Sequence, residues 1–166
     1  YQRPDGVSLS AELYLPVGYN RKKKEKLPLI MWAYPKEYKD KNSASQVMSS
    51  KNDFTFPYYG SPLYWVMKGY AVLDDVAFPI VGEAAEEPND SFIKQFVANA
   101  KAAIDAVDDL GYIDRAKVAI GGHSYGAFMT ANLLTHSTLF AAGIARSGAY
   151  NRTLTPFGFQ SEERTY

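Results

Sequence analysis

The sequence has 166 residues, a length typical of one domain, and its 46% of hydrophobic residues are enough for a buried core. Its 18 basic and 18 acidic residues cancel, which argues against nucleic acid or an anionic membrane as the main partner. No run approaches the length of a membrane span, and no signal peptide is recognisable. The absence of cysteine excludes disulfides and thiolate metal sites, and no pattern indicates a metal or cofactor.

The first three predicted strands lie at residues 7–15, 27–33 and 70–75. The first alternates apolar and mostly polar residues, as half-buried strands do. The other two are apolar runs of the kind that central parallel strands have. A short helix over residues 62–68, with Gly69 as its end, joins the second strand to the third.

Polar connections are expected between and after these strands. The Tyr34-Pro35 pair is expected to end the second strand, and the polar stretch after it is long enough to favour a functional loop. Residues 78–88 are expected to form another loop, in which three glutamates are solvated charges. The basic run at residues 21–26 is interpreted as a solvated loop rather than a nucleic-acid patch, because the whole chain is neutral.

The C-terminal half predicts two helices and two more strands. Asn89 or Asp90 is expected to cap a helix whose apolar side chains recur at helical spacing over residues 92–107. Residues 117–120 and 140–145 are apolar strands, and a helix that continues to His136 lies between them. Apolar strands that alternate with helices predict a mostly parallel α/β sheet with helices on both faces.

The motif Gly-x-Ser-x-Gly stands between a predicted strand and a predicted helix, at residues 122–126. That order is typical of a nucleophile elbow, a strained turn in which the residues flanking the serine must be small. Gly122 and Gly126 meet this need. Ser124 would then lie at the carboxyl end of a sheet strand, where α/β enzymes carry their chemistry. The sequence thus predicts an α/β-hydrolase fold with Ser124 as nucleophile; the alternative is a glycine-rich turn with a bystander serine.

A nucleophilic serine needs a base, and the base needs an acid that orients it. In this fold both follow the serine along the chain. After Ser124 there is no aspartate, and the only histidine, His136, is about three helical turns away and precedes Glu162 and Glu163. We therefore expect His136 to be a surface residue and His123 a packing residue. The sequence predicts an incomplete catalytic domain over residues 1–166, nearly inactive alone and lacking its C-terminal strands, or else a non-catalytic relative.

Two donors for the oxyanion of acyl transfer are candidates. One is the backbone N–H of Tyr125, the residue after the nucleophile. The other normally follows the strand at residues 27–33, where many esterases carry His-Gly-Gly. Here Tyr34 and Pro35 follow that strand, and proline has no N–H to donate. The Tyr34 hydroxyl is the candidate in its place, with packing of its ring on the sheet as the alternative.

Residues 121–129 (GGHSYGAFM) and 32–35 (WAYP) resemble the catalytic domain of the prolyl oligopeptidase family of serine peptidases. Residues 145–160 (ARSGAYNRTLTPFGFQ) resemble its glutamyl endopeptidase branch, known from plant plastids and bacteria. The resemblance implies peptide hydrolysis through an acyl-enzyme on Ser124, with Tyr34 as oxyanion donor. It also implies a triad Asp and His beyond the chain and an upstream β-propeller that limits substrate size. It leaves a plastid or an exported, periplasmic location open.

The resemblance further implies that residues 147–157 help to wall the pocket for the substrate residue before the cut. Tyr150 and Arg152 are expected near that pocket. For an acidic substrate residue a guanidinium is the natural partner, which makes Arg152 the first candidate and Arg146 the second; an arginine that holds its own loop is the alternative. The expected partner is a peptide or small protein, with a carboxylesterase or other acyl hydrolase as the rival function.

Overall fold

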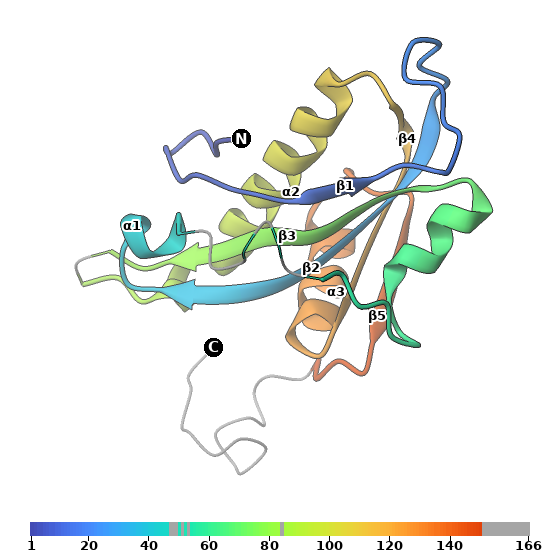
Figure 1. Ribbon diagram of the computed structural model, residues 1–166. Helices are drawn as coiled ribbons and strands as arrows, with labels where there is room; N and C mark the ends of the chain where they lie inside the picture. Colours follow the sequence, from blue (N-terminus) through green and yellow to red (C-terminus); the bar gives the residue numbers. More distant parts are fainter. Residues whose placement is uncertain (47–49, 51, 53, 84, 151–166) are drawn as a thin grey trace.

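The computed structural model describes residues 1–46, 50, 52, 54–83 and 85–150. A twisted sheet crosses the molecule, and helices lie on both of its faces (Figure 1). In chain order the elements are β1 (Glu12–Tyr14), β2 (Leu27–Tyr38), α1 (Lys41–Ala44), the 3₁₀-helix η1 (Pro62–Lys68), β3 (Ala71–Val81), the 3₁₀-helix η2 (Pro88–Ser91), α2 (Phe92–Asp109), β4 (Ile113–His123), α3 (Tyr125–His136) and β5 (Ala142–Arg146).

The sheet has the strand order β1-β3-β2-β4-β5, and only β1 runs antiparallel to its neighbour. The chain leaves β2 for β3 on one side and then crosses back to β4 on the other side. The order of the strands therefore reverses at β2. In open α/β sheets such a reversal opens a crevice at the carboxyl ends of the strands, and ligands bind there.

The helices α2 and α3 contact each other and cover one face, whereas η1 lies on the opposite face, in front of the sheet in Figure 1. This arrangement confirms the predicted α/β sheet with helices on both faces. Within the described ranges, none of the helices combines the length and the apolarity that a bilayer crossing requires.

The buried side of α2 is the one that its apolar spacing predicts. Its fully or almost fully buried apolar residues are Phe96, Ala100, Ala103, Ile104 and Val107. Each large one contributes about 1.5–3 kcal/mol by leaving water. Gly111, at φ 81°, follows the end of this helix, as a glycine in the left-handed region commonly does.

The expected cap of α2 is wrong. Asp90 accepts a hydrogen bond from the backbone N–H of Glu87 (3.0 Å) and so caps the preceding turn, η2. The N-cap position of α2 is held by Ser91, which makes no side-chain cap bond. The extra turn exists because Pro88 is preorganised for the first position of a helix.

Three strands are longer than predicted: β4 covers Ile113–His123 instead of residues 117–120, and β2 and β3 are extended as well. The expected end of β2 at Tyr34 and Pro35 is wrong, since the strand continues to Tyr38, and the expected loop at residues 78–88 begins only after Val81. Pro35 is tolerated because beyond Trp32 β2 pairs with β3 alone, so it behaves there as an edge strand. The parallel pairing of the two strands extends both of them past the apolar runs.

The first strand is shorter than predicted, because β1 has only three residues and pairs only as far as Asp74. The next residue, Asp75, has φ 46° and forms a bulge: Met31 pairs with Leu73, but Ala33 pairs with Val76. Aspartate enters the left-handed region more readily than most residues. The bulge inserts one extra residue into β3 and sets its register beside the second half of β2, and past it the N–H of Ala77 still donates to the carbonyl oxygen of Ser10 (2.8 Å).

Candidate active site

Ser124 forms the turn between β4 and α3 by itself. Its φ of 57° and ψ of −113° are strained for a residue with a side chain, and the residue is exposed. Its N–H donates to the carbonyl oxygen of Arg146 on β5 (3.0 Å), and its own carbonyl accepts from the N–H of Ala127 (3.0 Å). The strained peptide is therefore held from both sides, and the serine projects from the carboxyl end of β4.

The two glycines of the motif are needed because backbones approach closely here. A Cβ atom on Gly122 would lie 2.6 Å from the carbonyl group of Gly126 and 2.7 Å from the carbonyl oxygen of Ala33. A Cβ atom on Gly126 would lie 2.5 Å from that same oxygen of Ala33. Any side chain at either position would push α3 away from β2. The predicted need for small residues is thus met, and Ala33 is the neighbour that imposes it.

The two predicted oxyanion donors come together beside the elbow. Tyr34 follows Ala33 on β2, and its side chain is half exposed. Its ring packs edge to face on that of Tyr125, with centroids 6.2 Å apart. Tyr125 is the first residue of α3, so its N–H is among those that point out of the helix N-terminus. The oxyanion roles of both residues stay predictions.

Two residues that the sequence reasoning missed adjoin this pair. The Tyr125 hydroxyl donates to Glu37 (3.1 Å), which ties α3 to the end of β2. Asp75, at the bulge, lines a cleft of about 320 Å³ together with Tyr34 and Lys36. The aspartates that close the third predicted strand were a signal for the bulge. Nothing in the local sequence indicates Glu37, because it depends on the unexpected length of β2.

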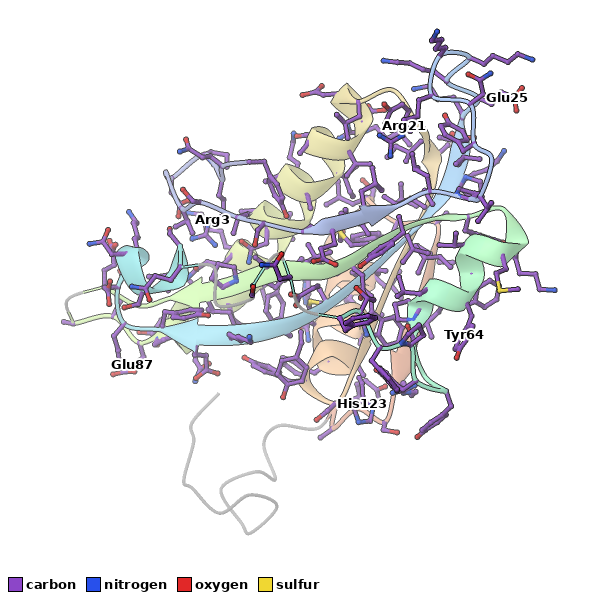
Figure 2. The ribbon with its side chains drawn as sticks, viewed as in Figure 1. Arg3, Arg21, Glu25, Tyr64, Glu87 and His123 are labelled. Carbon is purple, nitrogen blue, oxygen red and sulfur yellow. The ribbon has the colours of Figure 1, made fainter. Side chains whose placement is uncertain are left out.

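The two histidines lie at opposite ends of α3, with His123 just before Ser124 and His136 as the last residue of the helix. His123, expected to be a packing residue, is exposed at the end of β4 (Figure 2). It pairs in register with Arg146, whose Nε donates to its Nδ1 (3.4 Å). The prediction is wrong because the strand turns this side chain out of the core. His136 is exposed at the far end of α3, as expected of a surface histidine.

The residues predicted near the substrate pocket are described only in part. Tyr150 is half exposed, and its hydroxyl donates to the carbonyl oxygen of Ala145 (3.4 Å), on the preceding strand β5. Arg152 lies outside the described residues. Arg146, the second candidate for an acidic substrate, is instead bound to its surroundings through His123 and Gly60. The proposed pocket contacts of Tyr150 and Arg152 stay predictions.

Sequence comparison finds relatives for this chain. Residues 89–161 match the model of the prolyl oligopeptidase family. The chain is 56% identical, over 99% of its length, to a probable chloroplastic glutamyl endopeptidase of Arabidopsis thaliana, and 54% identical to one of Oryza sativa subsp. japonica. It spans only 17% and 18% of the length of these two proteins.

Solved structures agree in fold. Porphyromonas gingivalis dipeptidyl peptidase 4 aligns with a TM-score of 0.59 at 23% identity, over 87% of this chain and 19% of that one. A puromycin hydrolase aligns with a TM-score of 0.60 at 17% identity, over 95% of this chain and 23% of that one. Together with the sequence relatives, these likenesses confirm that the chain resembles the prolyl oligopeptidase family of serine peptidases and has the α/β-hydrolase fold of such peptidases.

Proposed function

We propose that the full-length protein is a serine peptidase that cleaves peptide bonds through an acyl-enzyme on Ser124. The observation that carries this proposal is the strained backbone of Ser124 between β4 and α3, next to β2, where the strand order reverses. The identity to probable glutamyl endopeptidases supports the substrate class.

In the proposed reaction, the Ser124 hydroxyl attacks the scissile carbonyl and gives its proton to a base. The tetrahedral oxyanion accepts hydrogen bonds from the Tyr125 N–H and the Tyr34 hydroxyl. One such donor contributes about 2.7–4 kcal/mol of transition-state stabilisation. His136 is separated from Ser124 by the whole of α3, roughly 18 Å at 1.5 Å per residue. His123 adjoins Ser124, but its Nδ1 accepts from Nε of Arg146, whereas the corresponding nitrogen of a triad histidine donates to an acid. We therefore infer that the base and its acid come from a part of the protein outside these residues.

Cleavage after glutamate is the proposed specificity, on the strength of the relatives' names. Arg152 is the residue we propose for binding the substrate carboxylate, because a guanidinium can grip it with two parallel hydrogen bonds. In the full-length protein, Arg152→Ala should slow cleavage after Glu far more than cleavage after Leu. Equal losses for both peptides would show that Arg152 does not select the acid.

A carboxylesterase on the same fold is the second candidate function. Against it stands Pro35, which cannot provide the backbone N–H that a His-Gly-Gly segment provides in many esterases. Hydrolysis of a short acyl ester without cleavage of any peptide would favour it. A non-catalytic module is the third, and it predicts no covalent chemistry at Ser124.

Labelling with a fluorophosphonate tests the proposal directly, because this reagent reacts with an activated serine. The full-length protein should be labelled at Ser124, as mapped by peptide mass spectrometry, and Ser124→Ala should abolish the label. A folded full-length protein that leaves Ser124 unlabelled would refute the mechanism.

A further inference from the structure

Arg146 is the last residue of β5, and its side chain makes several contacts besides the pairing of that strand with β4. Its guanidinium lies over the rings of Trp32 and Tyr59, with centroid distances of 5.8 and 6.0 Å. Its Nε donates to Nδ1 of His123 and its Nη1 to the carbonyl oxygen of Gly60, each at 3.4 Å. The side chain thus joins the middle of β2, the end of β4 and the segment before η1.

Two glycines make room for this cluster. A Cβ atom on Gly60 would lie 2.0 Å from Nη1 of Arg146, and one on Gly121 would lie 2.5 Å from the Trp32 ring. Neither glycine has a positive φ, so each is needed here for space rather than for conformation. The packing of the guanidinium is therefore specific: even a methyl group at Gly60 displaces it.

The main chain of Arg146 supports the nucleophile. Its carbonyl oxygen accepts the Ser124 N–H at 3.0 Å. That carbonyl belongs to the peptide that leads into Ser147, whose φ of 54° is also strained. A peptide beside a strained residue relaxes by rotation unless its surroundings hold it. The hydrogen bond from Ser124 holds this peptide at its carbonyl oxygen, and the anchored side chain holds the same residue from its other side.

We propose that Arg146 is a positioning residue for the nucleophile: its anchored side chain fixes the peptide whose carbonyl orients Ser124. The proposal rests on the proposed function. It differs from a role in binding an acidic substrate, since two guanidinium N–H groups and both ring contacts are already directed at the protein itself.

Three variants of the full-length protein test this role, with peptides that carry Glu or Gln before the cut. Arg146→Ala should lower kcat, and the rate of fluorophosphonate labelling with it, by about ten- to a hundredfold, since a shift of about 1 Å has that effect. KM and the Glu-to-Gln preference should not change. Gly60→Ala should act in the same direction by displacing the guanidinium, and the double variant should be no slower than Arg146→Ala. Arg115→Ala, on the exposed ion pairs with Asp105 and Asp108, is the control.

Tyr59→Leu is a second, milder variant that tests the same role of Arg146 if Arg146→Ala does not fold. Tyr59 is 95% exposed, so its loss removes one ring from the guanidinium without opening the core, and labelling should slow about two- to threefold. Wild-type labelling in either folded Arg146→Ala or Tyr59→Leu would overturn the proposal. A selective loss of activity on the Glu peptide would also overturn it, because it would assign Arg146 to substrate binding. Additive effects of Gly60→Ala and Arg146→Ala on the labelling rate would overturn it as well. An unlabelled wild-type Ser124 would instead refute the proposed function, and the inference with it.

Discussion

Gly126→Ala perturbs the contact on which the elbow depends most directly. The new Cβ atom would lie 2.5 Å from the carbonyl oxygen of Ala33 and 3.8 Å from the Cα atom of Tyr34. Carbon–oxygen contacts in proteins begin at about 3.3 Å, so α3 and the end of β2 must separate by roughly 0.8 Å. The neighbour is backbone, and it cannot move aside as a side chain can.

The expected cost follows from that displacement. Overpacking of this kind costs about 1–3 kcal/mol, offset by at most about 1 kcal/mol of helix propensity. In a domain of about 150–250 residues each kcal/mol lowers Tm by about 2–4 °C. Because the shift carries Tyr34 away from the elbow, we also expect the rate of fluorophosphonate labelling at Ser124 to fall by roughly tenfold or more.

Gly143→Ala provides the matched control for this experiment. Its Cβ atom also meets a neighbour at 2.5 Å, but that neighbour is the terminal Cδ1 of Leu134, which can change rotamer; the next contact, with Cγ2 of the buried Thr130, is at 3.1 Å and requires a shift of only a few tenths of an ångström. Thermal unfolding and labelling of both variants should therefore separate them, with Gly143→Ala close to wild type. If Gly126→Ala is as stable and as reactive as Gly143→Ala, the close approach of α3 to β2 does not govern the elbow.

Three further predictions concern single side chains. Tyr34→Phe should lower kcat by about 100- to 1000-fold with little change in KM if the Tyr34 hydroxyl stabilises the oxyanion. Tyr38→Phe, on the same strand, should leave kcat unchanged. Equal kinetics of the two variants would refute the oxyanion role of Tyr34. Arg3→Met should destabilise the fold by about 1–3 kcal/mol in thermal or denaturant unfolding, because the buried Arg3 donates to Asn99 (2.9 Å), which is itself fully buried. As a control, Arg115→Met removes an exposed arginine and should cost less than about 1 kcal/mol. A cost as small for Arg3→Met would contradict the reasoning. Burial raises the pKa of Asp74 above its ordinary value, so the stability from its protonated form is present at low pH and lost as pH rises through the raised pKa. Asp74→Asn should therefore raise Tm at neutral pH and leave it unchanged in acid, and a Tm gain that does not vary with pH would contradict this.

Much of the fold follows from local patterns in the chain. The apolar runs at residues 27–33, 70–75 and 117–120 become β2, β3 and β4 because a strand buried on both faces needs such runs wherever it lies. The elbow can also be predicted from the local sequence, since a tight strand-to-helix turn requires small residues beside Ser124 in any surroundings. These features need only a few consecutive residues, and so the sequence by itself determined them.

The rest depends on which strands become neighbours. The continuation of β2 past Pro35 was decided by its pairing with β3 and by the open edge beyond Trp32. The bond from Ser124 to Arg146 joins residues that are distant in the chain, and only the register of β4 against β5 brings them together. A hydrogen bond or a close approach between two distant segments cannot be predicted from the local sequence pattern of either segment. The local sequence therefore determined the turn that carries Ser124, whereas the tertiary structure decided the contacts that hold this turn, such as the bond to Arg146 and the approach of Ala33.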